Sequence, residues 1–329
     1  MIITASIMEG LFYNTCSKIP LTISSKYREP GMQNTFLYIV TVLIWGSTWL
    51  AITFQLGEVA PEWSVAYRFF LASLMLFIYS KLRDLKLRFS LREHLFIGMQ
   101  GLLLFSVNYI LVYFSELYIT SGMVSVLFSS VIVFNVFFGA LLLRSPVNGR
   151  VLLGALVGIA GLALIFWPEM QGVDLQGARL LGLGLAIISA LSASLGNIVS
   201  ARNQRNQLPV IQTNAYGMLY GAGLTALVAL VRGAPLGFEV SVGYIGSLAY
   251  LALFGSVVAF GAYLTLLGRI GPDRAAYIAV LFPVVALLLS ALFEGLTLEW
   301  TQLGGAALVL LGNGLVVNLR QRAAAPVAK

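Results

Sequence analysis

Long apolar stretches follow one another along this chain, and short segments with charges, proline, glycine or asparagine separate them. A helix needs about 20 predominantly apolar residues to cross the ~30 Å hydrocarbon core of a bilayer. The pattern therefore predicts an all-α integral membrane protein with ten transmembrane helices. We expect these helices near residues 36–55, 62–80, 95–115, 120–143, 151–168, 180–200, 210–231, 244–267, 274–294 and 300–319.

Composition supports a lipid environment. The 329 residues are 59% hydrophobic and 10% charged, and their mean hydropathy is +0.91. A soluble domain carries roughly 25% charged residues, so this chain has too few to cover a water-exposed surface. Cys16 is the single cysteine, which excludes an internal disulfide.

The net charge is +7, but the placement of the basic residues along the chain indicates a membrane topology and not nucleic-acid binding. All lysines and arginines except Arg68, Arg179 and Arg232 lie before the first span, in alternate loops, or after the last span. Cytoplasmic loops of membrane proteins are enriched in these residues. We therefore expect both termini on the cytoplasmic side of an inner or plasma membrane, and no nucleic-acid partner.

Short motifs recur in the same order in the two halves of the chain, with nearly the same spacing, which indicates a duplication of five helices. The matching motifs are Val126-Leu-Phe128 with Val280-Leu-Phe282, Ser106-Val107 with Ser256-Val257, and Gly154 and Gly161 with Gly305 and Gly312.

Because five is odd, the second copy enters the membrane in the opposite orientation, and such inverted repeats allow alternating access. The predicted domains follow from this arrangement. They are a flexible cytoplasmic N-terminal extension (1–31), a first five-helix repeat (32–175), a second five-helix repeat (176–320) and a cytoplasmic tail (321–329).

Arg68 is the only basic residue inside a predicted span, about 10 Å from its outer end. Ionisable groups within the membrane are costly and are candidates for function. Arg68 holds a carboxylate, either of a substrate or of Glu116 or Glu294, or else its side chain extends to the outer headgroups. An ion pair with Glu116 or Glu294 is the interpretation that the sequence favours slightly.

Three further residues are candidates for charge or gating roles. Glu116 and Glu294 end the third and ninth spans, so we expect both to be shallow in the membrane. Pro283 lies in the middle of the ninth span and frees a backbone carbonyl there. It serves either as a hinge or as a fixed kink.

Polar and aromatic residues inside the predicted spans are candidates to line a substrate cavity, because unpaired amides are costly in lipid. The alternative for each is ordinary hydrogen bonding between helices, which contributes about 0.6 kcal/mol on average. Trp45 lies too deep for an interfacial belt, so we expect it to form a cavity wall. The candidates are Trp45, Ser47, Asn108, Tyr109, Tyr113, Ser129, Asn135, Asn197, Tyr216, Tyr220 and Tyr263.

Several of these residues carry a family resemblance. Trp45-Gly-Ser47, Pro61 followed by Arg68-Phe69, Pro283 followed by Glu294, and the glycine-rich stretch from Gly304 to Gly312 resemble EamA-type transporters of the drug/metabolite transporter superfamily. The resemblance covers roughly residues 35–319. It implies ten helices in two inverted repeats and movement of metabolites or amino acids, often export.

The first copy departs from this pattern. Ser129 and Ala140 stand where the second copy has Pro283 and Glu294, so identical gating by the two halves is in doubt.

The favoured function is a transporter of a small metabolite, an amino acid or a related amphipathic compound, with export preferred. Drug-like cations and nucleotide sugars are the alternative substrates. A membrane enzyme is a competing class, but one histidine and one cysteine cannot form a metal cluster, so we expect no enzyme and no cofactor. A channel would need a ring of filter groups. The expected partners are the small-molecule substrate and the lipid bilayer, and the sequence assigns no oligomeric state.

Overall fold

A computed structural model describes residues 30–143, 149–171, 177–263, 278–297 and 299–324. The described residues form helices joined by turns and short loops, without strands. The helices are α2 (Pro30–Thr53), α3 (Pro61–Leu82), α4 (Leu91–Gln100), η1 (Gly101–Val107), α5 (Asn108–Glu116), α6 (Ser121–Phe128), α7 (Val131–Leu143), α8 (Gly149–Gln171), α9 (Ala178–Arg205), α10 (Val210–Val231), α11 (Val242–Tyr250), η2 (Leu251–Val258), α14 (Ile278–Phe293) and α15 (Trp300–Ala324).

Seven helical stretches in the described part of the chain are long and apolar enough to cross a membrane, which confirms a multi-pass membrane protein. They coincide with the first four predicted spans and with the sixth to eighth. The other three predicted spans fall on α8, α14 and α15, of which α14 is a shorter apolar helix. The seven stretches are Gln33–Thr53, Pro61–Leu82, Leu91–Glu116, Ser121–Leu142, Ala178–Arg205, Val210–Val231 and Val242–Tyr263.

The predicted N-terminal extension, 1–31, lies almost wholly outside the described residues. Its last two residues, Pro30 and Gly31, already belong to helix α2. The predicted C-terminal tail begins at residue 321, whereas α15 extends to Ala324. Both helices therefore extend past the apolar segments that the hydropathy pattern marks.

Local sequence signals explain where several helices begin. Pro61 occupies the first turn of α3, where its missing N–H has no intrahelical role. Ser90 and Glu93 form a capping box at the start of α4, and Ser241 accepts a hydrogen bond from the Tyr244 N–H at the start of α11.

Two helices contain a π-helical stretch. In the first, α4, η1 and α5 form one continuous helix, and in the second, η2 follows α11 directly. The two stretches carry the matching motifs Ser106-Val107 and Ser256-Val257. The Ser256 hydroxyl donates to the Leu251 carbonyl five residues earlier, at 3.0 Å. Such π-helical segments often occur at functional sites, and both stretches face the bundle interior in part.

The matching fourth and ninth helices differ. The fourth is interrupted at Ser129 and Ser130, which separate α6 from α7, whereas α14 is uninterrupted and contains Pro283. The Asn313 amide of α15 donates to the Ser129 carbonyl at 3.1 Å and to its hydroxyl at 2.9 Å. A side chain from another helix thus satisfies a carbonyl at the interruption.

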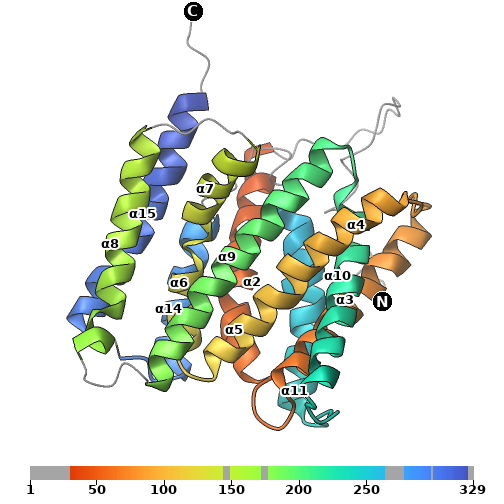
Figure 1. Ribbon diagram of the computed structural model, residues 1–329, viewed down its shortest axis with the longest axis horizontal. Helices are drawn as coiled ribbons and strands as arrows, with labels where there is room; N and C mark the ends of the chain where they lie inside the picture. Colours follow the sequence, from red (N-terminus) through yellow and green to blue (C-terminus); the bar gives the residue numbers. More distant parts are fainter. Residues whose placement is uncertain (1–29, 144–148, 172–176, 264–277, 298, 325–329) are drawn as a thin grey trace, which may run out of the picture.

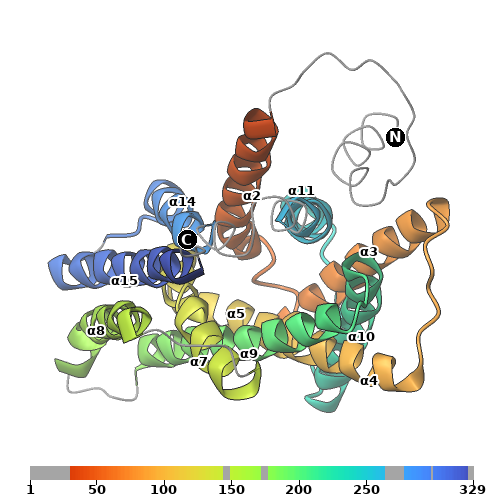
Figure 2. The same ribbon diagram turned by 90° about the horizontal axis from the view of Figure 1, so that it is seen from above.

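The long helices run side by side in alternating directions (Figure 1). The most extensive helix pairs combine one helix from each half of the chain: α8 with α15, α3 with α10, and α2 with α14. The α8–α15 pair lies at one edge of the bundle (Figure 2). Glycines allow its close approach, because a Cβ at Gly161 would lie 2.6 Å from the Gly305 carbonyl oxygen.

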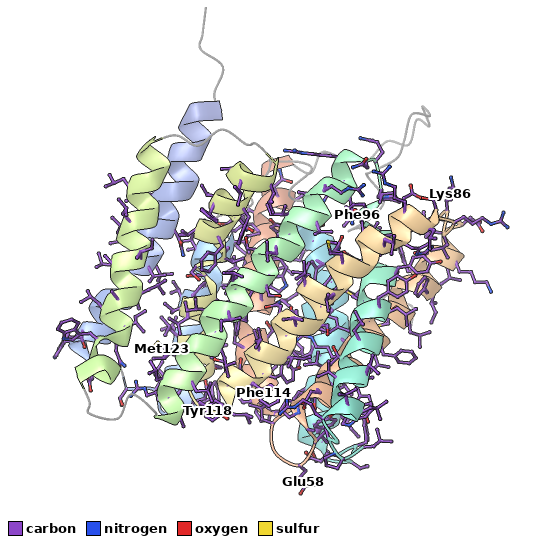
Figure 3. All side chains as sticks on the ribbon, viewed as in Figure 1. Glu58, Lys86, Phe96, Phe114, Tyr118 and Met123 are labelled. Atoms are coloured by element: carbon purple, nitrogen blue, oxygen red, sulfur yellow. The ribbon has the colours of Figure 1, made fainter. Side chains whose placement is uncertain are left out.

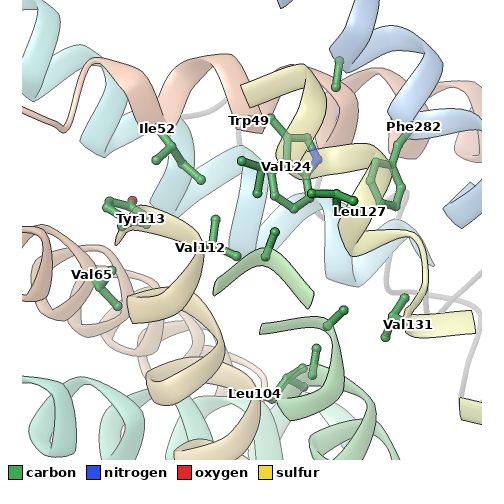
Figure 4. Packing of buried hydrophobic residues seen from close by; sticks show 14 of the residues in the cluster. Trp49, Ile52, Val65, Leu104, Val112, Tyr113, Val124, Leu127, Val131 and Phe282 are labelled. Atoms are coloured by element: carbon green, nitrogen blue, oxygen red, sulfur yellow. The ribbon is translucent and has the colours of Figure 1, made fainter. Parts of the chain in front are cut away.

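The main apolar core lies among α2, α3, α5, α6, α9, α10 and α14. Figure 4 shows Trp49, Leu127 and Phe282 close together in it, with Tyr113 beside Ile52. The core therefore surrounds the residues that the sequence singles out on α3 and α5.

Candidate functional site: a buried charged cluster around Arg68

Arg68 lies on α3, about 10 Å along the helix axis from its start at Pro61. Its side chain is 1% exposed. The guanidinium Nε donates to the Ser256 hydroxyl at 3.3 Å, and Cζ lies 4.6 Å from the centre of the Tyr109 ring. The Nη1 atom is buried without a hydrogen-bond partner. The Arg68 guanidinium is thus held by Ser256 and the Tyr109 ring, while its Nη1 atom has no hydrogen-bond acceptor.

The interpretation that the sequence favoured slightly, an ion pair of Arg68 with Glu116 or Glu294, is wrong for this structure. Neither carboxylate forms a salt bridge or a hydrogen bond with Arg68. Extension to the headgroups is also wrong, since the side chain is fully enclosed. The Arg68 Nε atom instead donates to the Ser256 hydroxyl on η2 at 3.3 Å.

Tyr113 and Glu116 lie one turn apart on α5 and bring two more buried polar groups to Arg68. Tyr113 is 0% exposed and Glu116 is 8% exposed. The Tyr113 hydroxyl and both Glu116 carboxylate oxygens have no hydrogen-bond partner. Tyr113 lies one turn from Tyr109 on α5, and the Tyr109 ring faces the Arg68 guanidinium. We call Arg68, Tyr109, Tyr113, Glu116 and Ser256 the Arg68 cluster.

Glu116 is buried although it lies at the end of its helix. It ends α5, near the end of the bundle at which Figure 3 labels Glu58 and Tyr118, yet neighbouring side chains cover it. Burial of polar oxygens without hydrogen-bond partners is costly, which makes this carboxyl group a stronger functional candidate than its sequence position suggested.

Glu294 has a different environment from Glu116. Its carboxylate accepts hydrogen bonds from the backbone N–H of Ser121, at 3.1 Å, and from the Ser121 hydroxyl. Ser121 begins α6, so the carboxylate also benefits from the positive end of that helix. Glu294 therefore joins the end of α14 to the start of α6, and its charge is compensated.

Trp45 and Gly255 connect the first helix to the Arg68 cluster. The Trp45 indole N–H donates to the Gly255 carbonyl at 3.3 Å, and its ring packs against Phe260 and Tyr263. A Cβ at Gly255 would lie 3.3 Å from Nη2 of Arg68, so the absence of a side chain there makes room for the guanidinium.

Ser47 and Trp49 complete the contacts of α2 near this site. The Ser47 hydroxyl lies 2.6 Å from the Tyr250 hydroxyl on α11. Trp49 is not among the predicted cavity residues, yet its ring stacks on Phe282 with centroids 5.9 Å apart and contacts Phe128 with centroids 5.2 Å apart. Trp49, rather than Trp45, contacts the aromatic residues of the matching fourth and ninth helices.

The candidate amides do not form one group. Asn135 on α7 accepts from the Ser194 hydroxyl at 2.9 Å and from the Asn197 amide at 3.4 Å, both on α9. Asn108 instead donates to the Leu104 carbonyl of its own helix at 3.2 Å, and its Oδ1 is buried without a partner. Ser129 is held by Asn313, away from these amides.

Tyr216 and Tyr220 lie on α10 and contact residues around the start of α4. Tyr216 donates to the Leu87 carbonyl at 3.0 Å, and the Tyr220 hydroxyl lies 2.9 Å from Nδ1 of His94. The Tyr216 contact connects α10 to the segment before α4, and the Tyr220 contact connects α10 to α4 itself. They do not place the two tyrosines beside Arg68.

The residues that sequence reasoning missed lie mainly on η2. Gly255 and Ser256 contact Arg68, and Ser121 binds Glu294. The repeated Ser-Val motif was a signal for Ser256, because it marked equivalent positions in both halves. Nothing in the sequence pairs Ser256 with Arg68, since 188 residues separate them.

Comparisons with known proteins address the family to which the chain belongs. The sequence profile of the EamA-like transporter family matches residues 34–167 and again residues 180–318. This chain belongs to the EamA-like transporter family. The predicted resemblance is thereby confirmed, and the chain is a transporter rather than an enzyme.

Named relatives of this EamA-like chain are also transporters. It is 31% identical over 284 residues to an Escherichia coli (strain K12) protein named "Uncharacterized inner membrane transporter YedA", covering 83% of this chain and 89% of the relative. It is 24% identical over 308 residues to the "Probable amino-acid metabolite efflux pump" of the same organism, covering 88% and 97%. A solved crystal structure, 19% identical, aligns over 89% of this chain and 99% of its own with a TM-score of 0.62, which shows a shared fold.

Proposed function

We propose that this EamA-like transporter moves a small amphipathic metabolite, an amino acid or a close relative, by alternating access. The Arg68 cluster is the observation that carries the proposal. It contains a guanidinium, a carboxyl group and a phenolic hydroxyl whose buried atoms have unused hydrogen-bonding capacity in the interior of a membrane protein. Intramembrane charges typically mark substrate or ion pathways, and Tyr109 and Phe69 provide aromatic surface next to Arg68.

The proposed architecture is ten helices in two inverted five-helix repeats, 32–175 and 176–320. Three observations support it: the family profile matches twice, π-helical stretches occur at matching motifs, and the main helix pairs combine the two halves. A pseudo-two-fold arrangement of this kind offers two equivalent packings, one open to each side. We also propose that both termini are cytoplasmic and that the favoured direction is export. The efflux pump among the relatives supports export.

Counterflow in proteoliposomes tests this function. Vesicles containing the purified chain are preloaded with unlabelled amino acids, amines, drug-like cations or nucleotide sugars, and uptake of each labelled counterpart is followed. We expect uptake of one amino-acid class, and at least a tenfold loss for Arg68→Ala because the buried cation would no longer bind an anionic group.

The matched control is Lys86→Ala, an exposed cation at the other end of the bundle. It should leave counterflow unchanged. Full activity of Arg68→Ala at normal protein levels would remove Arg68 from the substrate path, and uptake of another substrate class would correct the substrate.

A further inference from the structure

We infer that the surface where the start of α4 meets the end of α9 binds the phosphate group of an anionic phospholipid, with Arg202 and Arg92 as its two cationic contacts. This inference goes beyond the proposed transport of a metabolite. It rests on the proposed topology, which places this end of the bundle at the cytoplasmic leaflet. The observation that carries it is an arginine that the fold holds in place without a carboxylate partner.

Arg202 lies in the last turn of α9, where contacts with two helices order its side chain. Its Cζ atom lies 3.4 Å from the centre of the Phe96 ring on α4, and its Nη1 donates to Oδ1 of Asn203 at 3.2 Å. The Asn203 amide in turn donates to the Gln100 side chain at 3.1 Å, and the Gln100 amide donates to Asn214 at 3.0 Å. A buried series of amides across α9, α4 and α10 therefore fixes the residue beside the arginine.

Arg232, which follows the end of α10, shows what Arg202 lacks. The Cζ atom of Arg232 lies 4.9 Å from the centre of the Phe114 ring, and its Nη1 forms a 2.6 Å salt bridge with Glu62. Both arginines thus lie over an aromatic ring, but only Arg232 has a carboxylate. Among the described residues, no carboxylate forms a salt bridge or a hydrogen bond with Arg202. Arg202 is therefore an ordered, partly exposed cation that suits an anion from outside the chain.

The neighbouring surface of α4 combines a second arginine with apolar side chains. Arg92 is exposed and lies one turn before Phe96 on the same face of the helix. Leu91, Leu95 and Met99 recur every four residues and are 80%, 66% and 47% exposed. Acyl chains cover such apolar side chains in a membrane, so the arginines beside them lie where lipid phosphates lie. This placement favours a lipid over a soluble anion.

The chemistry of the two arginines favours an anionic head group. A guanidinium presents paired N–H groups that match two phosphate oxygens. Glu93, the carboxylate next to Arg92 in the chain, already accepts the Ser90 N–H in the capping box of α4. The local charge beside Phe96 is therefore positive, and it should distinguish a phospholipid with a net negative charge from a zwitterionic one.

Thermal unfolding of the purified full-length chain in a neutral detergent tests the site. The chain is titrated with phosphatidylglycerol, phosphatidylethanolamine or inorganic phosphate, and the rise in Tm gives an apparent affinity for each. For the wild-type chain we expect phosphatidylglycerol to bind at least tenfold more tightly than phosphatidylethanolamine. Inorganic phosphate at the same concentration should leave Tm unchanged.

The variants separate the site from the general positive charge of this end of the bundle. Arg92→Gln and Arg202→Gln should each weaken phosphatidylglycerol binding about fivefold, the loss expected for one arginine near an anionic surface. The matched control is the double variant Lys81→Gln/Lys86→Gln, which removes two exposed cations at the same end and should stay within about twofold of wild type. If Arg202→Gln fails to fold, Arg202→Lys replaces it and should weaken binding about threefold, because lysine lacks the planar group that lies over Phe96.

Three results would overturn the inference. Equal losses in the lysine control and in the arginine variants would show that the lipid responds to total charge and not to a site. Equal affinities for phosphatidylglycerol and phosphatidylethanolamine would exclude recognition of the anionic head group. Stabilisation by inorganic phosphate alone, to the same extent, would assign the arginines to a soluble anion. Each of these results leaves the proposed metabolite transport standing, because counterflow measures it separately.

Discussion

The fourth and ninth helices share the Val-Leu-Phe motif. A proline is expected to interrupt a helix, but the helix that contains the proline and the helix that is interrupted belong to different copies. Pro283 lies within the uninterrupted α14, whereas the helix without proline breaks at Ser129 and Ser130. The Ser129 hydroxyl donates to the Val126 carbonyl, and Asn313 donates to the Ser129 carbonyl. Helix continuity here depends on which partners satisfy the backbone groups and not on proline alone.

The two regions also contact each other directly. A Cβ at Gly122 of α6 would lie 2.7 Å from the Ser290 Cβ of α14, and Glu294 at the end of α14 binds Ser121. The broken helix and the proline-containing helix are therefore joined at one end by close packing and by a charged hydrogen bond. Substitutions at that junction and at Pro283 test how much each feature contributes.

The largest effect should follow from Gly122→Leu. The new side chain would collide with Ser290 and with the α14 backbone near Leu287, and it would force α6 away from α14. We expect a loss of about 3 kcal/mol in the free energy of unfolding, at the upper end of the range for overpacking. Denaturant titration in detergent measures it.

Gly223→Leu is the matched control, because nothing lies within 4 Å of a Cβ at Gly223. A Gly122→Leu chain as stable as this control would show that α6 and α14 separate at little cost.

A smaller effect is expected for Glu294→Gln. The amide would keep one acceptor for Ser121 but would lose the charge that favours the start of α6. We expect a loss of about 2 kcal/mol in the free energy of unfolding, with most of it absent when Ser121 is already alanine. A double-mutant cycle with Ser121→Ala measures this coupling.

Additive losses in that cycle would contradict the contact between α14 and α6. Glu299→Gln, an exposed carboxylate nearby in the chain, provides the reference for loss of a charge alone.

The smallest effect should come from Pro283→Ala. Because α14 is already continuous around the proline, restoring an N–H there should change the free energy of unfolding by less than about 1 kcal/mol. We expect the counterflow rate to stay within about threefold of the wild-type rate, as it should if Pro283 is a fixed kink that does not move during transport. A rate at least tenfold slower, with unchanged stability, would show that Pro283 acts as a hinge.

The hydropathy pattern predicted the helices well because few backbone structures are stable in the hydrocarbon core of a membrane. Every backbone N–H and C=O in the hydrocarbon region needs an internal partner, so a long apolar segment becomes a helix with almost no influence from its neighbours. The span predicted at 210–231 coincides with α10, and the span predicted at 62–80 differs from α3 by one residue at its start and two at its end. The break at Ser129 was not predictable, since it depends on Asn313 from a distant helix.

The candidate site was predictable only in its components. Composition and pattern singled out Arg68, Glu116, Tyr109 and Tyr113, because charges and aromatic hydroxyls are rare in an apolar chain. They did not show that Arg68 binds Ser256, or that Glu294 is compensated while Glu116 is not.

The sequence by itself determined that this is a helical, multi-pass transporter of the EamA-like family, since hydrophobic length, charge placement and short motifs are local properties of the chain. Only the tertiary structure decided which buried charges have partners. Hydrogen bonds and desolvation act over a few ångströms, and they join residues such as Arg68 and Ser256 that no local pattern connects.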